Sequence, residues 1–293
     1  PWMPVGMLPV EPGTKVAAIP RNPEILDIFT VGTDGGVYRN SNRAPILNRK
    51  WNTWTRVGSG FQVPPGTPLT ALSHPGGIIE LFVVHGNYKV WALQGYPPLT
   101  TPEFTWGDWS LIGGDYYSVS PKTPIAAADV MGYTVLYAFD QAVVPISTRR
   151  VTVNPITQYD SWFPINIHQS PARLSAPGLI RLPSAPPQEV PIGVFFVHSD
   201  RRVYGSFGRE DLSRNSWYST TKPFVGYWWP YSDLESPHDS PVTGLSLANF
   251  KNLFVVGTDG GVHQLRWEVA NADEYFGLAH KSEKWNRVGQ LSV

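Results

Sequence analysis

The sequence has no cysteine, which excludes disulfide bonds and thiolate chemistry. It also lacks any run of about 18 apolar residues, the length that a membrane-spanning helix needs, so no such span is expected. Net charge is zero because 23 basic residues balance 23 acidic ones, and no basic block occurs along the chain. Nucleic acids and anionic membrane surfaces attract clustered basic residues, so neither is expected as a partner.

Turn-forming and aromatic residues are abundant instead. The 293 residues include 29 prolines, 27 glycines and 12 tryptophans, and 42% of the chain is hydrophobic. Proline and glycine break helices and favour turns. The aromatic and β-branched content is too high for a disordered chain. These frequencies predict many short β-strands, joined by frequent turns around a sizeable core.

A repeat of about 55 residues runs through the chain. The stretch Val-Gly-Thr-Asp-Gly-Gly occurs at residues 31–36 and again at 256–261, with weaker relatives between them. The first aromatic residues of the five copies are Phe29, Phe82, Tyr137, Phe195 and Phe254. A second series follows the copies at a similar period: Trp54, Trp109, Trp162, Trp217 and Trp285. Two independent series with one period indicate five structural repeats.

Each repeat contains four expected strands. In the second repeat they are residues 69–74, 78–85, 88–94 and 106–113, separated by Pro75-Gly76-Gly77, by Gly86-Asn87 and by a longer proline-rich loop. Asp34 and Asp259 fall in the tight hairpins of the first and last repeats. Aspartate tolerates, and glycine readily adopts, the positive φ of such turns. We therefore interpret both aspartates as turn residues.

Repeated four-stranded units predict an all-β fold, a β-propeller of about five blades in a single domain covering residues 1–293. The expected blades are residues 7–58, 59–113, 114–166, 167–222 and 241–289, with an insertion at 224–241. The recurring tryptophans are expected to pack between blades. Residues 1–6 imitate a blade-ending strand, so they either pair at a seam that closes the ring or are the tail of a further blade.

The repeat pattern F-V-x-G-T-D-G-x-V-Y followed by W-x-x-V/I-G resembles β-propeller lectins, both the tachylectin-like type and the fucose-binding type of bacteria and fungi. The resemblance extends over all five repeats. Blade 3 departs from the pattern, because residues 139–147 lack the Asp-Gly turn. The resemblance implies glycan partners, fucosylated or N-acetylated sugars among them, with sugar sites between blades. A homo-oligomer is compatible with it.

Sugar-binding residues are expected among aromatic side chains that stand beside polar ones. Sugars offer a C–H face to aromatic rings and hydroxyls to planar or charged groups. Many aromatic residues of a propeller belong to the core, so each candidate also has a structural interpretation. The candidates are Tyr38, Arg39, Trp51, Trp91, Trp106, Tyr204 and His263, together with Trp228 and Trp229 in the segment 224–241.

Two other functions stay open. A carbohydrate-active enzyme, a hydrolase or a lyase, would need paired carboxylates. Asp27 and Glu80 occupy equivalent repeat positions, which favours repeated structure over a unique catalytic pair. A protein-binding propeller is the other alternative. No cofactor or metal is expected, since the histidines do not cluster as ligands. A lectin suits secretion or an extracellular location, and the absence of cysteine suits the cytoplasm equally.

Overall fold

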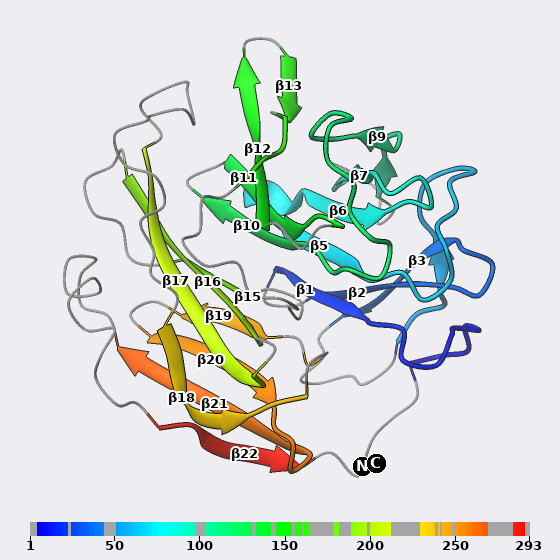
Figure 1. The fold of residues 1–293 in the computed structure, drawn as a ribbon. Coiled ribbons are helices and arrows are strands. Elements are labelled where there is room, and N and C mark those ends of the chain that lie inside the picture. The colour runs from blue at the N-terminus through cyan, green and yellow to red at the C-terminus, as the bar shows by residue number, and fades with distance from the viewer. Residues whose placement is uncertain are drawn as a thin grey trace. The chain divides into compact units, whose positions relative to one another are not determined.

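The computed structural model describes residues 5–22, 25–43, 51–97, 104–130, 133–141, 145–153, 156–159, 161–164, 178–181, 189–197, 200–211, 229–237, 240, 242–247, 250–268 and 284–290. These residues form five antiparallel sheets of four or five strands (Figure 1). Apart from the short 3-10 turn η1 (Pro75–Gly77), the secondary structure of the described part is β-strand. The predicted all-β class with about five small sheets is confirmed. We number the sheets blades 1 to 5 in chain order.

The chain divides into two compact units. Unit 1 comprises Pro1–Gln141 and Thr148–Trp162, and unit 2 comprises Ala142–Ser147 and Phe163–Val293. The prediction of a single domain stays a prediction. Among the described residues, no helix is long and apolar enough to cross a membrane.

The first four strands of blades 1, 2 and 3 pair in chain order. Blade 1 consists of β1 (Ala17–Asn22), β2 (Ile25–Val31), β3 (Val37–Arg43) and β4 (Thr55–Arg56). Blade 2 consists of β5 (Leu69–Ser73), β6 (Ile79–Val84), β7 (Val90–Tyr96), β8 (Thr105–Trp106) and β9 (Ser110–Leu111), with β8 and β9 both on β7. Blade 3 consists of β10 (Ala126–Val130), β11 (Tyr133–Phe139), β12 (Pro145–Val153) and β13 (Ile156–Tyr159), and the start of β12 also pairs with β14 (Phe163–Pro164).

Unit 2 repeats the same order in blades 4 and 5. Blade 4 consists of β15 (Gly178–Arg181), β16 (Glu189–Val197), β17 (Arg202–Asp211) and β18 (Trp229–Glu235). Blade 5 consists of β19 (Thr243–Leu247), β20 (Phe250–Val256), β21 (Gly261–Glu268) and β22 (Asn286–Gln290). First strands of successive blades are neighbours within each unit: β5 contacts both β1 and β10, and β15 contacts β19.

Blades 1 and 2 bury faces against each other, and so do blades 4 and 5. Side chains alternate between the two faces of a strand, so Phe29 and Val31 of β2 point to the same side. That side of blade 1 forms one buried cluster with Leu81 and Val83 of blade 2. In unit 2, blades 4 and 5 make an equivalent cluster around Phe195. Each fully buried aliphatic or Phe side chain stabilises the fold by about 1.5–3 kcal/mol.

The hairpin turns of blades 1 and 5 confirm the interpretation of their aspartates. The Gly36 N–H donates to Asp34 Oδ1 over 2.9 Å, and the same bond joins Gly261 to Asp259. In blade 1, the Val63 N–H donates to the Gly35 carbonyl over 3.0 Å, which ties the following linker to the turn. A repeated turn sequence therefore reflects a repeated backbone requirement.

A glycine after the last strand of one blade lies against the blade-ending tryptophan of the next. The pairs are Gly58 with Trp109 and Gly113 with Trp162, while Gly6 of the N-terminal segment lies against Trp54. All three glycines have positive φ. A Cβ atom on Gly58 would lie 2.6 Å from Trp109 Nε1, which no unshifted packing accommodates. The tryptophans therefore pack between blades, as expected, because the glycines lack a side chain.

The last strand of blade 4 differs from expectation. The predicted blade ended at residue 222, and residues 224–241 were taken as an insertion. The structure forms the fourth strand from Trp229–Glu235, inside that segment, with Gly205 opposite Trp229. Its Pro230 is compatible with the outer position, because an edge strand has unpaired backbone groups on one side. Trp217, the expected landmark, lies outside the described residues.

Replacing Gly58 with alanine should destabilise the fold more than replacing Gly60. Both glycines have nearly the same φ, 70° and 69°, but nothing lies within 4 Å of a Cβ on Gly60. We expect Gly60→Ala to lower the free energy of unfolding by about 1–2 kcal/mol through backbone strain. Gly58→Ala should cost about 1–3 kcal/mol more through overpacking against Trp109. Urea unfolding measures both, and equal losses would contradict the inter-blade contact.

Candidate functional site

The predicted residues Tyr38 and His263 lie beside the aspartate of their own hairpin turn. The Tyr38 hydroxyl donates to Asp34 Oδ2 over 2.8 Å, and His263 Nε2 lies 3.0 Å from Asp259 Oδ1. An arginine on the last strand completes each group. Arg56 lies 3.8 Å from the Asp34 carboxylate, and Arg287 lies 3.7 Å from the Asp259 carboxylate. We call these two groups, with Tyr204 and Asp200 of blade 4, the turn clusters.

The turn clusters are built alike because their residues occupy equivalent positions. Tyr38 pairs across the sheet with Arg56, just as His263 pairs with Arg287. In blade 4, the Tyr204 hydroxyl donates to Asp200 Oδ2 over 2.8 Å. The pKa of Asp34 is lowered by hydrogen bonds from the Gly36 backbone and the Tyr38 hydroxyl. Hydrogen bonds from His263 and the Gly261 backbone likewise lower the pKa of Asp259, so the Asp34 and Asp259 carboxylates are both held ionised at a partly exposed surface.

Trp91 occupies the equivalent position in blade 2 but lies in an aromatic group. Its ring centroid is 5.4 Å from that of Phe61 and 6.1 Å from that of His85. Phe61 also stacks on Trp109, with centroids 4.5 Å apart. The Trp91 Nε1 atom is buried and has no hydrogen-bond partner among the described residues. This candidate contributes more to packing than the turn tyrosines do.

The remaining aromatic candidates lie elsewhere on the blades. Trp51 forms an isolated bridge with Asn42 at the outer side of blade 1. Trp106 stacks on Phe104 at 5.4 Å and contacts Phe29 edge-on at 6.2 Å. Trp228 lies outside the described residues, and Trp229 is described only by its backbone at the start of β18. The structure therefore does not gather the predicted residues into one site.

Arg39 belongs to a different site from its neighbour Tyr38, since adjacent residues of a strand point to opposite faces. Arg39 Nη2 lies 2.7 Å from Asp27 Oδ1, and Arg21 Nε lies 2.8 Å from Asp27 Oδ2. The Asp27 side chain is 0% exposed. Phe104 of the next blade lies against both arginines, with guanidinium carbons 4.5 and 4.7 Å from its ring centroid. We call these four residues the Asp27 cluster.

Cation–π contact and ion pairing together hold the Asp27 cluster at the boundary of blades 1 and 2. A buried carboxylate requires compensating charge, and Asp27 has two guanidinium partners. The ring of Phe104 attracts both cations and shields them from water. Planar cations beside aromatic rings and a carboxylate are the groups that bind sugar hydroxyls and sugar C–H faces.

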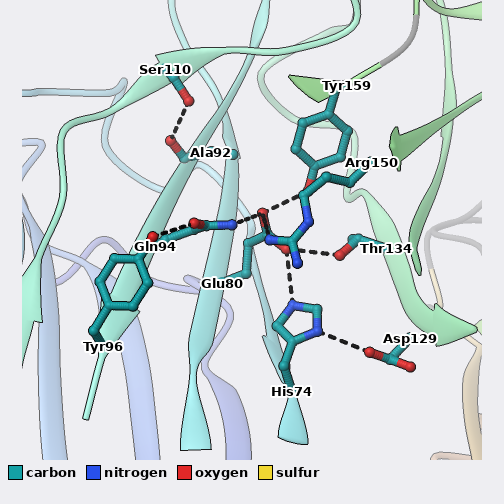
Figure 2. A network of polar contacts seen from close by, with 10 residues as sticks. All are labelled: His74, Glu80, Ala92, Gln94, Tyr96, Ser110, Asp129, Thr134, Arg150 and Tyr159. Carbon is teal, nitrogen blue, oxygen red and sulfur yellow. Dashed lines mark hydrogen bonds and ion pairs between the residues drawn. The ribbon is translucent and has the colours of Figure 1, made fainter. Parts of the chain in front are cut away.

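A larger polar network surrounds Glu80 at the boundary of blades 2 and 3 (Figure 2). Glu80 Oε2 accepts from the Thr134 hydroxyl at 2.9 Å and lies 3.0 Å from His74 Nε2. Glu80 Oε1 accepts from three further side chains: the Tyr159 hydroxyl at 2.7 Å, Gln94 Nε2 at 3.1 Å and Arg150 Nη1 at 3.4 Å. We call this network, with Asp129 and Tyr96 at its ends, the Glu80 cluster.

The Glu80 cluster reaches the surface at its ends, although its centre is buried. His74 Nδ1 lies 2.9 Å from Asp129 Oδ2, and the side chain of Asp129 is 20% exposed. On the other side, the Tyr96 hydroxyl donates to Gln94 Oε1 over 2.7 Å, and Tyr96 is 44% exposed. The centre therefore binds the two blades together, and only Tyr96, Asp129 and Arg150 are placed to meet a ligand.

The buried charges shift one another's protonation. Burial alone would lower the pKa of His74, but hydrogen bonds to Asp129 and Glu80 outweigh it and raise the pKa from 6.5 to about 8. Burial would raise the pKa of Glu80, whereas His74 and Arg150 hold that pKa below its usual value. Burial, reinforced by the Glu80 charge, raises the pKa of Tyr159. At neutral pH the cluster is a charged histidine between two carboxylates, with a neutral tyrosine.

Both clusters are built on the same repeat position. Asp27 and Glu80 precede Phe29 and Phe82 by two residues, and Asn252 precedes Phe254 likewise. Asn252 accepts from Gln264 Nε2 over 2.8 Å in blade 5. One feature of the sequence could have predicted these pairs, although the search for aromatic residues did not consider it. Arg21 and His74 each stand six residues before the acidic residue that they pair with. Phe104 had no such signal, because its loop lies between repeat landmarks.

Comparison with known proteins identifies the fold. No family model and no curated protein sequence matches the chain. BP39L lectin from Burkholderia pseudomallei matches over 99% of this chain and 73% of that chain, at 17% identity and a TM-score of 0.61. The Aleuria aurantia lectin, described as a six-bladed β-propeller with a novel fucose recognition mode, matches over 94% and 78%, at 14% identity and 0.58. The fold is a β-propeller.

A third β-propeller lectin supports the same conclusion. SapL1, solved in complex with alpha methyl fucoside, is 13% identical, with a TM-score of 0.57 over 95% of this chain and 80% of its own. At such identities the likeness establishes the propeller fold. The predicted resemblance to propeller lectins is thereby confirmed at the level of structure.

Tyr159→Phe should destabilise the propeller, whereas Tyr96→Phe should not. Removing the buried Tyr159 hydroxyl takes a donor from the Glu80 carboxylate, so we expect the free energy of unfolding to fall by about 1–3 kcal/mol. The Tyr96 hydroxyl bonds to Gln94 near the surface, where water replaces it, so its loss should cost less than about 0.5 kcal/mol. Chemical denaturation compares the two, and similar values would mean that the Glu80 cluster contributes little.

Stability should fall as the pH rises through the pKa of His74. A folded pKa of about 8 exceeds the unfolded value of 6.5, so the protonated histidine stabilises the native state fully below pH 6.5. That contribution, about 2 kcal/mol, is lost as the pH passes 8. Unfolding free energies measured across this range should show the decline in the native sequence and not in His74→Gln. If the unfolding free energy falls equally with pH in the native protein and in His74→Gln, groups other than His74 cause the decline.

Proposed function

We propose that this protein is a carbohydrate-binding lectin whose sites lie between successive blades. The proposal is supported by a propeller fold shared with structures described as lectins. The observation that links the proposal to particular residues is the Asp27 cluster. There, two guanidinium groups and a carboxylate from blade 1 meet an aromatic ring from blade 2. This chemistry suits a ligand that has both hydroxyls and C–H faces.

Repetition fits a lectin better than an enzyme. One sugar unit held by a few hydrogen bonds binds weakly, at about −4 kcal/mol for millimolar affinity. Several related sites on one molecule raise the avidity for a multivalent glycan. The turn clusters of blades 1, 4 and 5 supply such a repeated set, with Tyr38, Tyr204 and His263 at equivalent positions. The turn clusters, which include Tyr38 and His263, and the Asp27 cluster are thus two candidate sugar sites. Variants in each show which of them binds the glycan.

The Glu80 cluster favours the lectin over a glycoside hydrolase. A hydrolase needs two carboxylates that reach the scissile bond. Glu80 and Asp129 both contact His74, but Glu80 is 0% exposed and its two oxygens meet five side chains. A saturated carboxylate has no lone pair to offer a substrate. Its role in this proposal is to join the blades.

Fucosylated and N-acetylated glycans are the first ligands to examine. SapL1 was solved with alpha methyl fucoside, and another structure of the Aleuria aurantia lectin contains Fucalpha1-6GlcNAc. Secretion and homo-oligomer formation remain predictions from the sequence.

A glycan array followed by calorimetric titration should find saccharides that bind at more than one site per chain. Phe104→Leu keeps most of the volume but removes the ring, so it should weaken binding several-fold if the Asp27 cluster takes part. Tyr38→Ala tests the turn cluster in the same way. Tyr116→Ala removes an aromatic ring that is 86% exposed and outside both sets, so it should leave binding unchanged. A protein that binds no glycan on the array would refute the lectin proposal.

A further inference from the structure

The Asp27 cluster has one more positive charge than negative charge. Its two arginines, Arg21 and Arg39, share the single carboxylate of Asp27. The arginine side chains are only 12% and 11% exposed, so water compensates them little. Within the described part of the chain, neither arginine has an ion pair with any other acidic residue. A mostly buried site with an excess cation favours an anionic ligand.

Each guanidinium also retains hydrogen-bond donors. Arg21 uses Nε and Nη2 for Asp27, and Arg39 uses the same two nitrogens. Among the described residues, the Nη1 group of each arginine makes no hydrogen bond. Because a guanidinium is planar and its donors are fixed in direction, these remaining groups match a planar acceptor such as a carboxylate. Phe104 holds both guanidinium groups in place.

The Glu80 cluster provides an internal contrast. Two carboxylates, Glu80 and Asp129, balance Arg150 and a protonated His74 there. Charge is therefore matched within that cluster at neutral pH, and its central cations already face carboxylates. The charged residues named for the two clusters thus differ in net charge by one unit. Of these two clusters, the Asp27 cluster is the one whose described residues leave a cation to receive an anion.

We infer that the Asp27 cluster binds the carboxylate of an acidic sugar, a uronic or sialic acid unit. The Nη1 groups of Arg21 and Arg39, which have no partner among the described residues, donate to the sugar carboxylate, and the neighbouring Trp106 and Phe104 supply apolar surface for the ring. This inference rests on the proposed carbohydrate binding and specifies its ligand class. It makes Arg21 and Arg39 the residues that determine specificity for acidic over neutral sugars.

Pairs of ligands that differ only in the carboxylate test the inference on the intact protein. Calorimetric titrations compare methyl glucuronide with methyl glucoside, methyl galacturonide with methyl galactoside, and sialic acid with its methyl ester. We expect at least one acid to bind tenfold or more tightly than its neutral partner, with the difference reduced in 1 M salt by screening. Equal binding within every pair overturns the inference.

Arginine variants locate the preference. Arg21→Met and Arg39→Met keep the length of the side chain and remove the charge, so each should weaken binding of the acid far more than binding of its neutral partner and abolish the preference. Arg56→Met, in a turn cluster, is the matched control and should leave the preference intact. A preference that survives both cluster variants overturns the assignment. If Arg39→Met does not fold, Arg21→Met and the ligand pairs still test whether the Asp27 cluster causes the preference for the acidic sugar.

The two proposals fail in different ways. A protein that binds neutral glycans on the array but shows no acid preference remains a lectin, and only the acidic-sugar inference falls. A protein that binds no saccharide of either class refutes the lectin proposal itself. Binding of the acids that is lost in Phe104→Leu and in Arg21→Met together supports both.

Discussion

Everything in this fold depends on the contact between one blade and the next, because a small sheet with apolar side chains on both faces cannot bury them alone. Phe29 on blade 1 and Leu81 on blade 2 are fully buried only through each other's sheets. The close approach at the outer strands needs a residue without a side chain, and Gly58 supplies it against Trp109. The glycine–tryptophan pairs Gly58 with Trp109 and Gly113 with Trp162 thus have one structural cause, which recurs with the repeat.

The same packing determines where charge can be placed. Once two faces close on each other, a carboxylate on β2 or β6 is removed from water and needs cationic or hydroxyl partners. Asp27 and Glu80 find different ones. Glu80 is neutralised by residues from two blades and becomes a structural centre, whereas Asp27 is overcompensated by two arginines. The same repeat position therefore holds two blades together at Glu80 and forms a candidate binding site at Asp27. The side chains around the carboxylate make this difference, since both residues are acids.

The sequence predicted the fold well because its signals are local. Alternating apolar residues, Asp-Gly turns such as that at Asp34 and the period of about 55 residues all act over short distances along the chain. The strand of residues 229–235 was missed because aromatic and acidic residues together suggested a ligand segment rather than an edge strand. The site was predicted less well. Tyr38 and Arg39 were grouped as neighbours, although alternation places them on opposite faces.

The sequence by itself determined the repeat, the four strands of a blade and the turn role of Asp34 and Asp259, since each follows from periodicity or from backbone preference. Only the tertiary structure decided which charged groups meet. Arg39 and Phe104 stand far apart in the chain, and Glu80 contacts Tyr159 across two blades. Such contacts depend on which faces close together and in what register. No local pattern records that, because a strand shifted by one residue would bring a different set of side chains to the boundary.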